Sequence, residues 1–265
     1  MGLFERDYNV ITEEEIIAKD RVIKEHTPNP DHPELKNSGY YRAQPKAIRH
    51  HESLFPNNFL DVEDLQDAAN LKEWNQRYID FISMPRINEL DIKRFIQANR
   101  TYHIIGSIMK NYRFGHHGAF LFKEFKLGTS YTADYVLVGD SSNGYQFIFV
   151  ECEHPNYHIT IDDGEFGEAI RKGINQINDW KDVLNADFSC ITSEFKKHTT
   201  KQLPDEFYRF DSSRFFFVVV AGLRADFTNK TYRLARKLKK DSEIDVLHYE
   251  NLYDLAERII GEATY

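Results

Sequence analysis

Apolar and polar positions follow a strand-like pattern in two neighbouring segments near the middle of the chain. Tyr131–Val138 and Gln146–Glu153 are rich in β-branched and aromatic residues, and Gly139–Gly144 between them has the composition of a turn. This pattern predicts a β-hairpin. The preceding segment, Ala119–Lys126, predicts one more strand.

Three carboxylates gather at one end of this predicted hairpin. If it turns symmetrically about Ser142 and Asn143, Asp134 lies opposite Glu151. Residues i and i+2 share a strand face, so Glu153 points the same way as Glu151. Unpaired carboxylates are costly at the end of an apolar hairpin, and a divalent cation is a common reason for gathering them. The pattern therefore indicates a metal site.

Other segments show helical spacing or continuous apolar runs. The spacing predicts helices over Asp61–Ser83, Ile87–Asn99, Glu165–Leu184, Lys230–Lys240 and Asn251–Glu262. The stretch between Asn99 and Tyr112 fits either helix or strand. Arg214–Ala221 has the pattern of a strand buried on both faces, and Ile244–His248 predicts a last short strand. Together these elements predict an α/β fold with a mixed sheet flanked by helices.

The N-terminal region differs from the rest. Its first 60 residues hold five prolines, many charges and short apolar runs such as Tyr8–Ile11 and Arg21–Lys24. This composition indicates a small β-containing module or an extended arm. We therefore expect an N-terminal appendage over residues 1–84 and a main domain over residues 85–265.

Composition narrows the class of protein. The 265 residues carry a net charge of −8, so contacts with nucleic acid must come from local basic patches or bound metal. Cys152 and Cys190 suggest reduced thiols rather than a disulfide framework. Met1–Asp7 lacks the pattern of a signal peptide and no apolar run reaches membrane-spanning length, so we expect a cytoplasmic protein without a membrane partner.

The order of the acidic residues resembles that of the PD-(D/E)xK nuclease core. Glu89 lies on a predicted helix, Asp134 on a strand, and Glu151 and Glu153 on the next strand, which a helix follows. On that helix, Gln176–Trp180 resembles the Gln-x-x-x-Tyr signature of exonuclease branches, although Trp180 also fits an ordinary core residue. The resemblance implies a restriction-endonuclease-like fold.

A more specific resemblance is to the Shedu anti-phage nuclease family. It spans roughly residues 85–262, and its marks are Asp91–Ile96 with Asn99, Leu127-Gly128, Val150–Pro155, Ala169–Trp180, Ala221–Arg224 and Ile244–Tyr249. The family resemblance implies a metal-dependent DNA nuclease of bacterial antiviral defence. It also implies a homo-oligomer and a regulatory N-terminal region.

The two resemblances imply roles for particular residues. Asp134 and Glu151 would bind Mg²⁺ or Mn²⁺ together with the Cys152 carbonyl, and Gln176 would position substrate or water. Glu89 is either a further metal ligand or an acidic residue that complements a helix dipole.

One position departs from the family pattern. Glu153 stands where the PD-(D/E)xK motif has Lys, which would orient the attacking water and offset negative charge. Glu153 could act as a base or a metal ligand, and the cation could come from Lys126, Arg171, Lys172 or His154. The alternative is a catalytically degenerate domain that binds nucleic acid or a protein partner without cutting.

Basic residues outside the motif are candidates for contacts with DNA phosphates. These candidates are Lys126, Lys172, Arg224, Arg233, Arg236 and Lys237. The Gly222–Arg224 segment equally fits a turn after the buried strand. The histidine pairs His50-His51 and His116-His117 have no Cys partner at zinc-ligand spacing, which argues against a zinc site.

Overall fold

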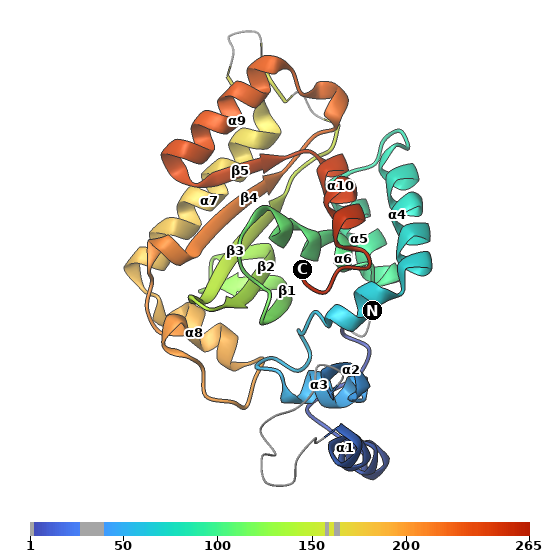
Figure 1. The fold of residues 1–265 in the computed structure, drawn as a ribbon. Helices are drawn as coiled ribbons and strands as arrows, with labels where there is room; N and C mark the ends of the chain where they lie inside the picture. The colour runs from blue at the N-terminus through green and yellow to red at the C-terminus, as the bar shows by residue number, and fades with distance from the viewer. Residues whose placement is uncertain (1–2, 27–39, 157–158, 162–164) are drawn as a thin grey trace.

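A five-stranded mixed sheet forms the centre of the protein (Figure 1). The computed structural model describes residues 3–26, 40–156, 159–161 and 165–265. In the order in which they neighbour one another, the strands are β1 (Gly118–Leu127), β2 (Tyr131–Ser141), β3 (Gly144–Cys152), β4 (Phe215–Val220) and β5 (Ile244–Leu247). The first three are antiparallel, whereas β3, β4 and β5 run parallel. The predicted α/β fold with a mixed sheet is confirmed.

Helices cover both faces of this sheet (Figure 1). One face carries α4 (Ala68–Ile82), α5 (Glu89–Asn99), α6 (His103–Gly106) and α10 (Tyr249–Ile259). The other carries α7 (Glu168–Ala186), α8 (Ser189–Lys196) and α9 (Asn229–Ser242). Short 3₁₀ helices lie at η1 (Val62–Gln66), η2 (Ser107–Asn111), η3 (Asp205–Phe207), η4 (Ser212–Arg214) and η5 (Arg224–Asp226).

The position of β4 between the two helical layers explains its continuous apolar sequence. Phe217 and Val219 enter the core on the α7 side, while Val218 and Val220 enter the core on the α4 side. Because side chains alternate between faces, a strand covered on both sides has no polar position to offer solvent. The prediction of a strand buried on both faces is confirmed.

The hairpin has the predicted symmetry. Tyr135 pairs with Val150 and Ser141 pairs with Gly144, which places the turn at Ser142 and Asn143. The turn is shorter than the predicted six residues because the strands continue through Ser141 and Gly144. Gly144 adopts a φ of 83°, which favours glycine at the end of a tight turn.

Among the described residues, the N-terminal prediction of short strands is wrong. The described residues before η1 form three helices, α1 (Glu13–His26), α2 (Tyr40–Ala43) and α3 (Lys46–Glu52), and the segment Arg21–Lys24 lies within α1. The three consecutive glutamates in the first turn of α1 complement its dipole, which favours a helix over a strand.

The predicted helices need correction at their boundaries; for example, α7 begins at Glu168 rather than Glu165, and α10 begins at Tyr249 rather than Asn251. The predicted helix Asp61–Ser83 is divided into η1 and α4 at Asp67. The side chain of Asp61 caps η1 by accepting the backbone N–H of Glu63. Helix α5 begins at Glu89 rather than Ile87, since Asn88 and Asp91 form a capping box. The ambiguous stretch before Tyr112 is helical, as α6 and η2.

Helix α4 is packed into the core of the main sheet. Leu71 and Tyr78 belong to the same buried cluster as Ile148 and Val150 of β3. Residues just before position 84 therefore help to support the hairpin, while the predicted domain division at that position stays a prediction.

A buried histidine on the α4 side predicts acid sensitivity. His103 contacts Asn75 Oδ1 through Nε2 at 2.9 Å, and burial lowers its pKa from 6.5 to about 3. The unfolded chain therefore binds one more proton than the folded chain between these pH values, so the free energy of unfolding falls as pH falls below 6.5. We expect His103→Gln to reduce this pH slope by up to about 1.4 kcal/mol per pH unit, measured by denaturant unfolding. An unchanged slope would contradict a neutral buried His103.

Candidate metal and nucleic-acid site

Strands β2 and β3 bring the predicted carboxylates together at the end of the hairpin opposite its turn. Asp134 directly precedes Tyr135, which pairs with Val150, so Asp134 lies beside Glu151. Its Oδ2 accepts the backbone N–H of Cys152 at 2.9 Å. The side chain of Asp134 is thereby attached to the neighbouring strand.

Two of the three hairpin carboxylates are buried, and Glu89 on α5 adds a fourth carboxylate near Glu153. Glu151 and Glu153 are 6% and 2% exposed. Among the described residues, Glu151 Oε2, Glu153 Oε1 and Glu89 Oε2 are buried without a hydrogen-bond partner. Unsatisfied buried carboxylate oxygens are costly, so this end of the hairpin is poised to receive a proton or a cation.

Two lysines neutralise part of this acidic cluster. Lys93 on α5 lies 2.6 Å from Asp134 Oδ1, and Lys172 on α7 lies 2.8 Å from Glu153 Oε2. Lys172 is one of the cations expected in place of the motif lysine. Lys93 was not among the sequence-based candidates; the available signal was its i+4 spacing from Glu89, which places both residues on one face of a helix.

Burial and the neighbouring charges shift the pKa values of this cluster. Burial, with the nearby Asp134 and Glu153, raises the pKa of Glu151 from 4.5 to about 9. Burial also raises the pKa of Glu153, although Lys172 opposes the shift. Burial acts to lower the pKa of Lys93, but Asp134 outweighs it and leaves the pKa raised. Glu151 is therefore protonated near neutral pH when no cation is bound.

A glycine on α7 sets the position of Lys172. A Cβ atom on Gly173 would lie 2.8 Å from Val219 and 3.3 Å from Glu153 Cγ. Because a contact of 2.8 Å cannot be accommodated without movement, glycine allows α7 to approach the sheet closely. This approach brings Lys172 to Glu153.

An open groove of about 680 Å³ runs from Lys172 along the same helix. Gln176 is half-buried and lines this groove together with Arg171 and Thr132. The aromatic position of the signature does not line it: Trp180 is fully buried and packs near Phe149. The interpretation of Trp180 as a core residue is confirmed.

The other predicted phosphate-contacting residues are spread over the molecule. Lys126 is exposed on β1 and pairs with Thr132 of the groove. Arg224 forms an ion pair with Asp254 of α10 and follows Gly222, whose φ of 72° fits the turn interpretation. Arg233, Arg236 and Lys237 are exposed on α9. Among the predicted phosphate-contacting residues, Lys172 is the one that contacts a carboxylate of the hairpin, Glu153.

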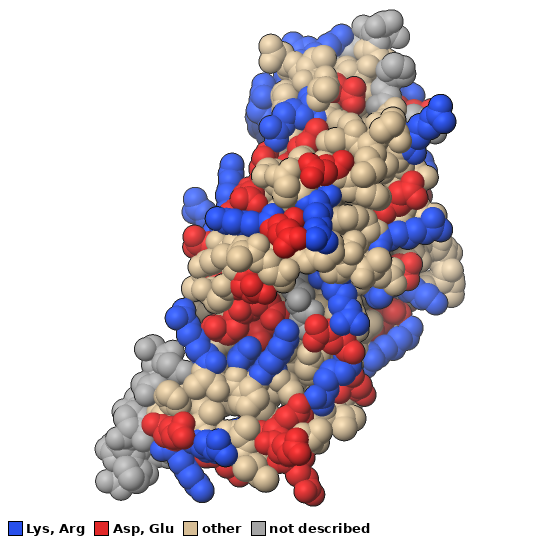
Figure 2. Space-filling model, turned by 90° about the vertical axis from the view of Figure 1, so that its right-hand side faces the viewer, with Lys and Arg blue, Asp and Glu red and all other residues tan. Residues whose placement is uncertain are grey.

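Acidic and basic side chains are intermixed on the face that lies to the right in Figure 1 and carries α4 (Figure 2). Within the described ranges, no group of three or more His, Cys, Asp or Glu side chains is already arranged to hold a metal ion. Lys93 and Lys172 instead contact oxygens of Asp134 and Glu153. Cys152 and Cys190 are both free thiols.

Replacing Glu151 should stabilise the protein in the absence of metal. Its raised pKa means that the folded chain binds more protons than the unfolded chain between pH 4.5 and about 9, so its contribution to stability falls as pH rises through this window. We expect Glu151→Gln to raise Tm in EDTA by about 2–4 °C at pH 8, and by less at about pH 5. Thermal unfolding at the two pH values checks this, and a lower Tm at pH 8 would contradict it.

Comparison with known proteins identifies the family of this chain. No helix in the described part of the chain is both long and apolar enough to cross a membrane. No curated protein matches the sequence. The family model described as "Shedu protein SduA, C-terminal" matches residues 58–253. This match starts earlier than the resemblance seen in the sequence, since it includes η1 and α4. The chain therefore belongs to the Shedu family, and this membership points to a role in anti-phage defence.

Proposed function

We propose that the protein is a metal-dependent deoxyribonuclease with a PD-(D/E)xK core. The element order supports this, because α5 precedes the three antiparallel strands and α7 crosses from β3 to the parallel strand β4. Glu89, Asp134 and Glu151 with Glu153 occupy α5, β2 and the end of β3 in the order that this core requires.

The unpartnered carboxylate oxygens carry the proposal. Glu89 Oε2, Glu151 Oε2 and Glu153 Oε1 are buried without a partner among the described residues. Burial, together with the neighbouring Asp134 and Glu153, raises the pKa of Glu151. Hard divalent cations such as Mg²⁺ and Mn²⁺ bind carboxylate oxygens. The donor set at the end of the hairpin therefore fits such a cation.

Asp134 and Glu151 would hold the cation, with the Cys152 carbonyl as a further oxygen ligand. When bound, the cation would supply Lewis-acid stabilisation of a phosphate and an activated water. Lys93 would first have to leave Asp134 Oδ1, which it contacts at 2.6 Å. Glu151 would lose its proton on loading, so cation affinity should rise with pH.

Glu153 and Lys172 together would replace the motif lysine. Lys172 lies 2.8 Å from Glu153 and supplies the positive charge that the motif position lacks. The Lys172 ammonium would offset negative charge on the scissile phosphate. Glu153 would act as the base that accepts a proton from the attacking water, or as a further metal ligand. The groove along α7 leads to this pair, and Arg171 and Gln176 on its wall would contact the DNA backbone or position water.

A DNA cleavage assay tests the proposal directly. Purified protein should cut linear double- or single-stranded DNA in Mg²⁺ or Mn²⁺ and should be inactive in EDTA. Binding of DNA without cutting in either metal would instead favour the catalytically degenerate domain, in which Lys93 and Lys172 keep the carboxylates neutralised. The homo-oligomer, the cytoplasmic location and a regulatory role of the N-terminal region stay predictions.

A further inference from the structure

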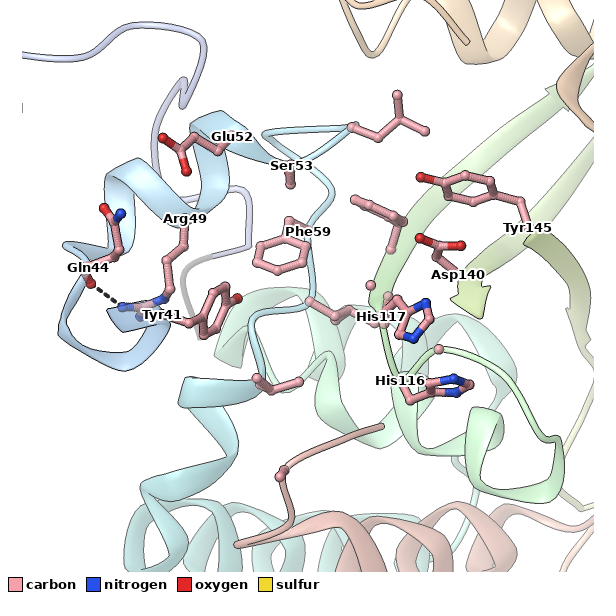
Figure 3. A pocket seen from close by; sticks show the side chains of 18 of the residues that line it. Tyr41, Gln44, Arg49, Glu52, Ser53, Phe59, His116, His117, Asp140 and Tyr145 are labelled. Atoms are coloured by element: carbon pink, nitrogen blue, oxygen red, sulfur yellow. Dashed lines mark hydrogen bonds between the residues drawn. The ribbon is translucent and has the colours of Figure 1, made fainter. Parts of the chain in front are cut away.

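A cavity of about 450 Å³ lies between the N-terminal helices and the turn end of the hairpin (Figure 3). Its walls come from residues 40–62, 115–120 and 140–145, with Ala263 near the end of the chain. Its volume lies within the range of small-molecule sites, about 300–1,000 Å³. Four distant parts of the sequence therefore meet around one partly open cavity.

This cavity is separate from the carboxylate cluster. Asp140 on its wall lies six positions after Asp134 on β2. Six residues of extended strand span about 20 Å, so a small molecule in the cavity cannot reach Asp134. The inference drawn from this cavity therefore goes beyond the proposed nuclease function.

Aromatic side chains supply flat surfaces in the cavity. Figure 3 shows Phe59 between Tyr41 on the α2–α3 side and Tyr145 on the hairpin side. Phe59 is held by packing against Phe120, with ring centroids 5.7 Å apart. Tyr41 is 40% exposed, so part of its surface is accessible. Such rings favour a planar partner, because aromatic groups stack face to face with an offset or meet edge to face.

The polar side chains that line the cavity include both carboxylates and a histidine. Asp140 and His117 lie on the hairpin side, and Glu52 lies across the cavity from them (Figure 3). Burial raises the pKa of Asp140, and the nearby His117 opposes this shift. Asp140 can accept hydrogen bonds from N–H groups of a ligand, and its negative charge disfavours a phosphate-rich ligand. Glu52 can also accept, although its Oε1 already forms an ion pair with Lys19 at 2.6 Å.

Arg49 and Gln44 complete the α2–α3 wall of the cavity. Arg49 is fixed by an ion pair with Asp61 at 2.8 Å and lies over the Tyr41 ring, 5.7 Å from its centroid. Gln44 is 3% exposed, and neither its amide nitrogen nor its amide oxygen has a partner among the described residues. An amide with both functions unsatisfied is suited to a heterocycle that carries a donor beside an acceptor.

We propose that this cavity binds a nucleobase or nucleoside, that is, a planar nitrogen heterocycle with N–H donors. Its ring stacks against the aromatic side chains, and its amino or imino groups donate to Asp140 or Glu52. The ligand thereby joins the N-terminal helices to the hairpin. The same chemistry is offered by a free nucleoside and by an unpaired base at the end of a DNA strand.

Calorimetry and thermal shift of the full chain in EDTA test this inference. The probes are adenosine, guanosine, cytidine and uridine at about 1 mM, with inorganic phosphate as the control anion. Tyr41→Ala and Asp140→Asn remove a stacking surface and an acceptor. Tyr232→Ala is the matched control, because Tyr232 is similarly exposed, at 38% against 40% for Tyr41, and lies on α9 outside the cavity.

We expect at least one amino-bearing nucleoside to bind the wild type and Tyr232→Ala alike. We expect Tyr41→Ala and Asp140→Asn each to weaken this binding about tenfold or more. Absence of binding by every nucleoside, equal binding by all three variants, or the same shift with inorganic phosphate alone would overturn the inference.

Two further measurements distinguish a free nucleoside from a DNA end as the ligand, and the cavity inference from the nuclease proposal. The preferred base is offered as a free nucleoside and at the end of a short single-stranded oligonucleotide, and the tighter binder identifies the source. Binding should persist in Asp134→Asn, whose carboxylate lies at the other end of β2. Nucleoside binding without DNA cleavage would reject the nuclease proposal alone, and cleavage without nucleoside binding would reject the cavity inference alone.

Discussion

Asp134→Asn should lower the rate of metal-dependent DNA cleavage by about 10³-fold or more. The substitution removes a charged metal ligand, and a bound metal contributes several kcal/mol of charge stabilisation in the transition state. The asparagine oxygen can still accept the N–H of Cys152, which Asp134 accepts at 2.9 Å, so the strands should stay paired. Single-turnover cleavage of linear DNA with saturating Mg²⁺ measures the effect.

The matched control is Asp245→Asn. Asp245 lies on β5 and pairs with Lys239 at 2.7 Å, much as Asp134 pairs with Lys93 at 2.6 Å. Each substitution therefore removes one charge and one lysine ion pair from the sheet, but Asp245 lies outside the carboxylate cluster. A similar loss of cleavage in both variants would point to a general structural effect and contradict the site.

Lys172→Met should reduce cleavage by about 10²-fold, whereas Arg171→Met should reduce it much less. Both side chains line the groove on α7, but Lys172 contacts Glu153, at 2.8 Å. The loss of its ammonium leaves charge on the scissile phosphate without a local cation. Cleavage rates of the two variants at one ionic strength measure the difference, since both remove one positive charge from the groove.

The exchange Glu153→Lys with Lys172→Glu tests how the two residues share the motif role. It restores Glu-x-Lys at the C-terminal end of β3 and moves the carboxylate to α7. If position 153 needs only a nearby cation, the double variant should retain cleavage within about tenfold of the wild type. If Glu153 is itself a metal ligand or the base, the double variant should lose cleavage as completely as Asp134→Asn. Equal cleavage by Lys172→Met and Arg171→Met would reject the role of Lys172 in either case.

The sequence predicts the hairpin and its carboxylates well because their geometry is local. Two segments rich in β-branched and aromatic residues around a short turn favour one symmetric register, and that register places Asp134 beside Glu151. The buried strand β4 and the core position of Trp180 were also predictable, since both follow from apolar patterns.

The partners of the carboxylates were harder to predict because they come from distant segments. Lys93 is 41 positions away from Asp134 in the sequence, and only its helical spacing from Glu89 hinted at a shared site. The close approach that brings Lys172 to Glu153 depends on Gly173, whose role appears once α7 is packed on the sheet. The cavity near Phe59 has the same origin, since its walls are joined only by folding.

The N-terminal error has a different cause. Prolines and short apolar runs in residues 1–60 suggested strands. The prolines at residues 28, 30 and 33 lie outside the described residues. The described helices α1 and α3 lie on either side of them, and Pro45 directly precedes α3, where proline is well tolerated.

Calorimetric titration of the metal-free protein with Mn²⁺ tests the central claim most directly. The wild type and Asp245→Asn should each show saturable binding that releases a proton near neutral pH, because Glu151 has a raised pKa. Asp134→Asn and Glu151→Gln should each lose this binding. Absence of binding to the wild type, or unchanged binding in both of these variants, would contradict a metal site at the end of the hairpin.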